Sequence, residues 1–203
     1  MSIAFPPSTH LPDPNMSRLT SLLLAVALAG APLFAAAPAA PAARVNSSGG
    51  NSPHETTGAV IGRGGPRVTI TYGRPSAKGR KVWGELVPWN QAWRLGSDEA
   101  TTLITQQPLA IGEAVIPAGI HTLYLVPSES GVTKLAFSSA LGGWGIPVDT
   151  THDIVRVDAK KDTLPAAVEQ LTIAVTADAA TGGGVLKISW ETTQFSVPFT
   201  IKK

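Results

Sequence analysis

The sequence predicts an all-β protein, either an antiparallel β-sandwich or a partly closed barrel of about 8–10 short strands. Apolar and polar residues alternate in several short runs, which is the pattern of strands with one buried face. Turn residues rich in Gly and Pro separate these runs at a spacing of about 8–12 residues, as in sandwiches and barrels. Helical periodicity is confined to a single expected turn at residues 163–169.

The chain begins with a segment that we expect to be removed. Residues 1–15 carry no leader pattern and are interpreted as a disordered extension or a start-site artefact, with Met16 as the initiator. Residues 16–37 have the order of a secretory signal peptide: Arg18, an apolar run rich in Leu and Ala, and small residues at the cleavage site. The apolar run has about 16 residues, fewer than the ~20 that span a bilayer. The pattern therefore predicts export followed by cleavage.

The remainder divides into a linker and one domain. Residues 38–52 are mostly Ala, Pro, Ser and Gly, so we expect a disordered linker. Residues 53–203 are predicted to form a single β domain, and about 150 residues can bury about 70% of their unfolded surface. The chain has no Cys, which excludes lipid attachment at the cleavage site. We therefore expect a soluble periplasmic or secreted product without a membrane anchor, and a net charge of +2 gives no reason to expect nucleic acid.

The strands are predicted from alternation. The clearest runs are residues 68–72, 171–175, 186–190 and 195–201; further candidates are 101–105, 120–126, 133–138 and 153–158. The Gly-rich stretch 62–66 reads as a hairpin turn. Pro198 cannot donate a hydrogen bond to a neighbouring strand, so it predicts that the last strand lies at an edge of the sheet.

Residues 73–100 interrupt this rhythm and are predicted to form one long irregular loop. The segment contains three of the five Trp residues and a cluster of basic side chains. The basic residues are Arg74, Lys78, Arg80, Lys81 and Arg94, and the acidic residues among them are Glu85, Asp98 and Glu99. Long irregular segments in compact domains are often functional.

The basic residues admit two interpretations. Arg presents a planar set of donors that suits carboxylates and phosphates, and nearby Trp rings can stack on a sugar, so the loop can recognise an anion. Alternatively the same residues form an internal network that satisfies the backbone carbonyls of the loop. Trp83, Trp89 and Trp93 likewise form either an exposed aromatic platform or a small core beneath the loop.

Catalytic and metal-binding candidates are few. His121 shares its expected strand face with Leu123 and Leu125, and could act as a general base with Asp98 or Glu99. The His residues lack the spacing of a metal site, so no metal and no cofactor is expected.

Several motifs together resemble domain-of-unknown-function family 2911. They are Arg74-Pro75 with Lys78-Gly79-Arg80, Trp83-Gly84 with Leu86-Val87-Pro88-Trp89, Trp93-Arg94 with Glu99-Ala100-Thr101, Pro117-Ala118-Gly119, Trp144-Gly145 and Trp190-Glu191. The resemblance covers residues 52–203 and implies a bacterial envelope protein with a signal peptide and a β-rich domain. The chain departs from the family at Ser97-Asp98, where Ala-Asn is frequent, so it lacks an amide donor there.

These observations leave three hypotheses for the function. The first is a non-enzymatic periplasmic binding or interaction module for an anionic or glycan ligand such as a cell-envelope glycan fragment, with a protein partner as another occupant. Its contact residues would be Arg74, Lys78, Arg80, Trp83, Trp93 and Arg94, with Glu99 orienting the Arg side chains. The second is a hydrolase or isomerase that uses Asp98 or Glu99 with His121. The third is a purely structural role for the motif.

Overall fold

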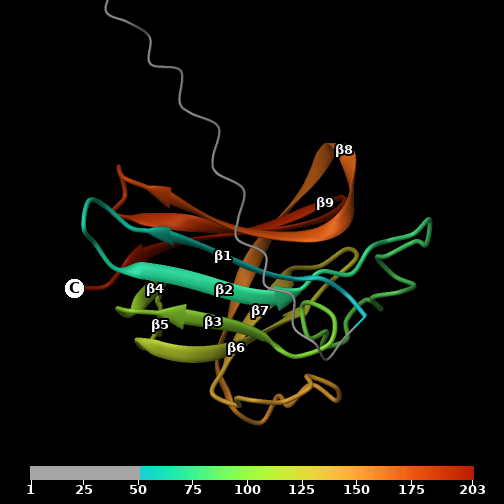
Figure 1. Cartoon of the computed structure of the whole chain (residues 1–203), viewed down its shortest axis with the longest axis horizontal. Coiled ribbons are helices and arrows are strands. Elements are labelled where there is room, and N and C mark those ends of the chain that lie inside the picture. Colours follow the sequence, from blue (N-terminus) through green and yellow to red (C-terminus); the bar gives the residue numbers. More distant parts are fainter. Residues whose placement is uncertain (1–50) are drawn as a thin grey trace, which may run out of the picture. The chain divides into compact units, whose positions relative to one another are not determined.

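The computed structural model describes residues 51–203, and every structural statement below concerns this part of the chain. It contains nine strands and no helix (Figure 1). The strands are β1 (His54–Val60), β2 (Arg67–Gly73), β3 (Thr101–Thr105), β4 (Leu109–Ile111), β5 (Ala114–Ile116), β6 (Gly119–Val126), β7 (Thr133–Ser138), β8 (Asp153–Asp178) and β9 (Gly183–Ile201). The predicted extension, signal peptide and most of the linker lie outside the described residues.

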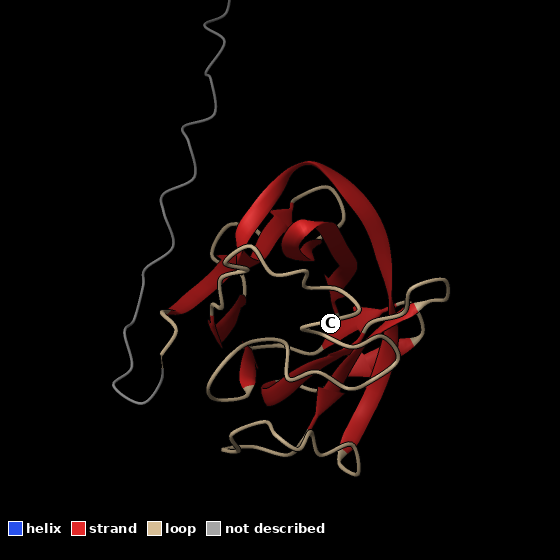
Figure 2. Ribbon diagram, turned by 90° about the vertical axis from the view of Figure 1, so that its right-hand side faces the viewer, coloured by secondary structure: helices blue, strands red, loops and turns tan. Residues whose placement is uncertain are grey.

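All nine strands belong to one antiparallel sheet in the order β1-β2-β3-β6-β7-β8-β9-β4-β5. The sheet curves back on itself, so that β1 lies close to β8 without pairing with it (Figures 1 and 2). It does not close into a barrel, because β1 and β5 remain its ends. The predicted all-β class, with a sandwich or partly closed barrel, is therefore confirmed.

Two long strands hold the two layers together. β8 pairs through its first residues with β7, and from Lys160 onward with β9. β8 thus belongs to the layer of β1, β2, β3, β6 and β7 at one end and to the layer of β9, β4 and β5 at the other. The pairing of β8 with β9 shifts register between Thr163 and Val168 and again before Thr172, and irregularities of this kind let a strand bend.

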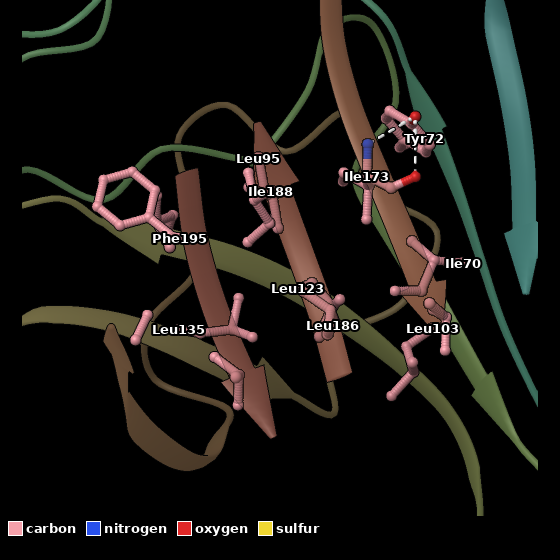
Figure 3. Close-up of a cluster of buried hydrophobic side chains, with 14 of the residues drawn as sticks. Ile70, Tyr72, Leu95, Leu103, Leu123, Leu135, Ile173, Leu186, Ile188 and Phe195 are labelled. Atoms are coloured by element: carbon pink, nitrogen blue, oxygen red, sulfur yellow. Dashed lines mark hydrogen bonds between the residues drawn. The ribbon is translucent and has the colours of Figure 1, made fainter. Parts of the chain in front are cut away.

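The core lies between the two layers. Alternate residues of each strand point inward, and the buried side chains include Ile70, Leu103, Leu123, Leu135 and Ile188 (Figure 3). Full burial of one such side chain stabilises the fold by about 1.5–3 kcal/mol. Figure 3 also shows Tyr72 of β2 beside Ile173 of β8: its hydroxyl accepts from the Ile173 N–H at 2.8 Å and donates to the Ile173 carbonyl at 3.3 Å. These two hydrogen bonds connect the layers inside the core.

Two sequence predictions about the strands are wrong. The helical turn expected at residues 163–169 is part of β8, because pairing on both sides of the register shift keeps the chain extended. The edge position expected for the last strand is also incorrect, since β9 lies between β8 and β4. Pro198 is tolerated there because β8 pairing reaches Ser196 and β4 pairing begins at Thr200.

Most of the remaining boundaries agree with the alternation. The predicted strands at 101–105 and 133–138 coincide with β3 and β7, and the Gly-rich turn connects the antiparallel strands β1 and β2. The runs at 186–190 and 195–201 are one continuous strand, β9, rather than two. The alternation did not predict β1, β4 or β5. Within residues 51–203 no helix has the length and hydropathy needed to cross a membrane.

Candidate functional site

The expected irregular segment is present at residues 74–100, because Gly73 is the last residue of β2, and isolated bridges fasten it to the sheet. Ser76 bridges to Gln170 of β8, and Trp93 bridges to Leu125 of β6 through two backbone hydrogen bonds of 2.8 Å. The segment therefore lies along both layers. Its side chains divide into four groups with different surroundings.

Arg74 belongs to the interior of the protein. Its Nη1 lies 2.6 Å from Oε2 of Glu55, its Nε donates to the Leu171 carbonyl at 2.9 Å, and its Nη2 donates to Oγ1 of Thr172 at 2.8 Å. The side chains of Arg74 and Glu55 are only 10% and 9% exposed. All three guanidinium nitrogens are engaged by the protein, so Arg74 is not placed to contact a ligand from solvent.

Lys78 and Arg80 are exposed and lie in a local turn. The Lys78 N–H donates to Oε1 of Glu169 at 2.7 Å, which ties the turn to β8. Arg80 donates from Nε to the Ala77 carbonyl at 2.9 Å and from Nη2 to the Ser76 carbonyl at 2.8 Å. These contacts satisfy backbone carbonyls of the loop, as the structural interpretation of the basic cluster expects.

The Trp residues pack as a small aromatic core. Trp83, only 5% exposed, lies at its centre with ring centroids at 6.1 Å to Trp89, 5.9 Å to Trp93, 6.4 Å to Trp190 and 5.1 Å to Phe195. The indole N–H of Trp83 donates to the Trp190 carbonyl at 3.2 Å. Each aromatic pair of this kind adds about 0.5–1.5 kcal/mol beyond its area burial. Trp83 and Trp93 are thus placed as packing residues under the segment.

Arg94 differs from the other basic residues, because it is only partly buried and faces a second loop. Its Nη1 donates to the carbonyls of Asp98 at 2.5 Å and Trp144 at 2.9 Å, and its Nε to Gly96 at 3.4 Å. Its guanidinium carbon lies 5.7 Å from the centroid of the Trp144 ring. Burial lowers the pKa of Arg94 and the nearby carboxylates oppose this, but Arg keeps its charge at all ordinary pH values. Among residues 51–203, Nη2 of Arg94 makes no hydrogen bond.

The second loop is the connection between β7 and β8, residues 139–152, which we call the 139–152 loop. It lies on the outer face of the sheet: Thr122 donates to the Ala140 carbonyl at 2.5 Å, and the Ala100 N–H donates to Gly143 at 3.2 Å. Beneath it Tyr124 is buried, although its neighbours Leu123 and Leu125 point into the main core on the opposite face. The loop therefore covers Tyr124 from outside.

A cavity of about 190 Å³ lies between Arg94 and the 139–152 loop, and we call it the Arg94 cavity. Its walls include Arg94, Ala100, Thr122, Tyr124, Leu141 and Asp149. Apolar side chains of the 139–152 loop remain open to solvent: Leu141, which lines the cavity, is 54% exposed, and Trp144 and Ile146 of the same loop are 49% and 65% exposed. Exposed apolar side chains that cluster on one loop are typical of interaction sites.

Tyr124, which lines the Arg94 cavity, is held in its neutral form. Its hydroxyl donates to Oδ2 of Asp153 at 2.6 Å, and Nε of Arg156 donates to the same oxygen at 2.7 Å. Burial raises the pKa of Tyr124 well above its ordinary value, and the Asp153 carboxylate raises it further. The cavity wall therefore carries a neutral phenol across the physiological pH range.

A second cavity, of about 210 Å³, lies beside the first, and we call it the Glu99 cavity. His54, Thr71, Glu99, Ala100 and Thr102 are among its walls. Nε2 of His54 lies 2.7 Å from Oε2 of Glu99. A hydrogen bond from its own backbone N–H and the contact with His54 lower the pKa of Glu99, so this half-exposed carboxylate is ionised at neutral pH.

The structure does not bring His121 together with a carboxylate among the described residues. Its Nε2 lies 2.8 Å from the Pro117 carbonyl, and its buried Nδ1 has no partner. Asp98 instead accepts from the Ser52 N–H at 3.2 Å, and Glu99 contacts His54. No group of three His, Asp or Glu side chains within residues 51–203 is arranged to hold a metal ion.

Sequence reasoning found Arg94 but missed most of the cavity around it. Leu141, Val148 and Tyr124 come from parts of the chain that looked like a loop and an ordinary strand. The available signal was the concentration of Leu, Trp and Ile within a Gly- and Pro-rich stretch that fits no strand alternation. Apolar residues in such a stretch have no sheet face to bury against.

Comparison with known proteins identifies a family. No curated protein and no solved structure matches the chain. Residues 52–199, nearly all of the described part, match the family described as protein of unknown function (DUF2911). The chain therefore belongs to the DUF2911 family.

Proposed function

We propose that this protein is a non-enzymatic binding module of the cell envelope that takes an anionic sugar into the Arg94 cavity. The observation that carries the proposal is the pairing of a guanidinium that lines the cavity with a half-exposed indole: the guanidinium carbon of Arg94 lies 5.7 Å from the centroid of the Trp144 ring, and both chain neighbours of Trp144 line the cavity. A guanidinium suits a carboxylate, and an indole face suits the apolar face of a sugar ring.

The surroundings of this pair support a binding role. Arg94 is fixed by the carbonyls of Asp98 and Trp144, so it is held in position before a ligand arrives. Preorganised groups lose little conformational entropy on binding. Nη2 remains as the donor of Arg94 that makes no hydrogen bond within residues 51–203. The proposed contact residues are therefore Arg94 and the 139–152 loop rather than the whole 73–100 segment.

The cellular place of the module is part of the proposal. It rests on the signal-peptide pattern of residues 16–37, which predicts export to the periplasm or the medium. The other basic and aromatic residues of the segment, represented by Arg74 and Trp83, would support the fold rather than contact the ligand.

A thermal-shift titration with galacturonate, with neutral galactose as the comparison, tests this proposal. At 100 times its dissociation constant, a ligand stabilises the fold by about 2.7 kcal/mol, a shift of about 5–10 °C for a domain of this size. We expect a shift with galacturonate that Trp144→Ala removes. Lys78→Ala is the matched control, because Lys78 is an exposed cation of the same segment outside the cavity. A shift unaffected by Trp144→Ala, or no shift at all, would overturn the proposal.

A further inference from the structure

The Arg94 cavity and the Glu99 cavity meet at Ala100. This residue, immediately before β3, lines both of them. Thr102 lines the Glu99 cavity and Thr122 lines the Arg94 cavity, and these two residues are directly opposite each other in the pairing of β3 with β6. The two cavities therefore open on the same outer face of the sheet, side by side.

A row of hydroxyl side chains crosses five strands, and three of its members line the cavities: Thr71 and Thr102 the Glu99 cavity, and Thr122 the Arg94 cavity. Strand register places Thr56 opposite Thr71, Thr71 opposite Thr102, Thr102 opposite Thr122, and Thr122 opposite Ser138. We call these five residues the hydroxyl row. Because neighbouring strands are about 4.8 Å apart, the row extends over about 19 Å. The three members that line the cavities lie on adjacent strands and span about 10 Å, which suits a ligand that crosses the strands from one cavity to the other.

The hydroxyl groups at the two ends of the hydroxyl row have different hydrogen-bond partners within the protein. At the β7 end the hydroxyls hold the 139–152 loop: Thr122 donates to Ala140 and Ser138 to His152. At the β1 end the Thr56 and Thr71 hydroxyls contact each other at 2.9 Å on the exposed face. A hydroxyl has one donor and two acceptor positions, so this pair retains capacity for a ligand.

The charged groups also differ between the ends of the paired cavities. The Arg94 cavity holds the guanidinium of Arg94, and the Asp149 carboxylate in its wall is engaged by the Thr151 hydroxyl and the His152 ring. The Glu99 cavity holds the Glu99 carboxylate in contact with His54. A carboxylate accepts hydrogen bonds from sugar hydroxyls, whereas it would repel a second anionic group placed against it. The arrangement suits a ligand with its acidic group at one end and hydroxyl groups along the rest of its length.

We propose that the two cavities form one groove for a linear acidic oligosaccharide, which lies across the strands along the hydroxyl row. This inference rests on the proposed function, because it takes the anionic sugar in the Arg94 cavity as the first residue of the chain. The following sugar residues lie over Ala100 and Thr102 and reach the Glu99 cavity, where Thr71 and Glu99 contact their hydroxyl groups.

Calorimetric titration with galacturonate alone, and with chains of two to four residues in which one terminal galacturonate is followed by neutral galactose residues, tests the groove. We expect the tetramer to bind at least about tenfold more tightly than the monomer, the gain from one to two additional hydrogen bonds. A Thr71→Val/Thr102→Val variant should lower tetramer affinity to that of the monomer and leave monomer affinity unchanged. Valine keeps the shape and the strand preference of threonine, so the fold should persist.

Thr69→Val is the matched control, because Thr69 lies on the same strand and the same face outside both cavities. It should bind the tetramer as the unchanged protein does. Monomer binding that Trp144→Ala abolishes, with no gain in affinity from longer chains, would overturn the groove and retain the single-cavity proposal. A tetramer affinity unchanged by the double substitution would also overturn the groove. Absence of binding at every length would overturn both.

Discussion

Arg74 and Glu55 form an ion pair at 2.6 Å in the interior between the two layers, where each side chain is about nine-tenths buried. Arg74 is further held by the Leu171 carbonyl and by Thr172 on β8. The pair therefore joins β1, the start of the 73–100 segment and β8. Removing one partner of such a pair leaves the other buried and uncompensated.

We predict that Glu55→Gln lowers the free energy of unfolding by about 3–5 kcal/mol, the range for a broken buried ion pair. Urea denaturation measures this change. Glu85→Gln is the control, because Glu85 lies 3.6 Å from Lys81 with both side chains about two-thirds exposed. Exposed pairs contribute about 0–1 kcal/mol, so equal effects of the two substitutions would contradict an interior role for the Arg74 pair.

Replacement by alanine should lower stability at Trp83 and ligand binding at Trp144. Trp83→Ala empties the centre of the aromatic core and should cost about 3–5 kcal/mol of stability. Trp144→Ala removes a half-exposed ring, so it should change stability by less than about 1 kcal/mol while abolishing galacturonate binding. Denaturation and calorimetry on both variants check this separation. A large stability loss in Trp144→Ala would place that ring among the packing residues.

Gly145 fixes the distance between the 139–152 loop and Arg94. Its φ is 78°, and an added Cβ would lie 2.9 Å from Cβ of Arg94. Gly145→Ala should therefore cost about 1–2 kcal/mol for the left-handed backbone and also displace Arg94, which weakens galacturonate binding. Gly142→Ala, at φ 74° with no atom within 4 Å of the added Cβ, is expected to carry the backbone cost alone. If both variants bind equally well, Gly145 does not position Arg94.

The raised pKa of Tyr124 predicts how the free energy of unfolding changes at alkaline pH. Burial and Asp153 raise its pKa in the folded protein, so folding favours the neutral phenol. This contribution is fully present below the unfolded pKa of about 10 and is lost as the pH rises from there towards the folded pKa. Stability should therefore fall above about pH 10, and Tyr124→Phe should reduce that fall. Denaturation at a series of alkaline pH values measures it; identical pH profiles would refute the assignment.

The fold class was predictable because alternation is a local property. β3 and β7 agree with the sequence prediction because each strand has one face in the core, so their apolar residues occur at every second position. The alternation did not predict β1 because residues 54–58 contain no large apolar side chain, so that its pairing with β2 leaves no period-2 apolar pattern in the sequence. The local sequence also does not predict that β8 is one continuous strand, because its bend around residues 163–172 depends on pairing with β9.

The site was predictable only in part, for a related reason. Composition identified the 73–100 segment, and the segment does contain Arg94. Whether an Arg in it faces solvent or the interior depends on partners elsewhere: Arg74 is buried because Glu55 and Leu171 meet it there. Those partners lie on β1, which alternation did not predict, and on the long strand β8, so no local pattern separates Arg74 from Arg94.

The long strand β8, which pairs with β7 and with β9, also determines how the domain unfolds. Because β8 pairs with β7 in one layer and with β9 in the other, neither layer can lose its hydrogen bonds independently at that boundary. Partial opening is then confined to the ends of the sheet and to surface loops, while the rest separates in a single cooperative step. Amide hydrogens of the middle of β8 and β9 should exchange with solvent only through that global event, even if the 139–152 loop opens locally.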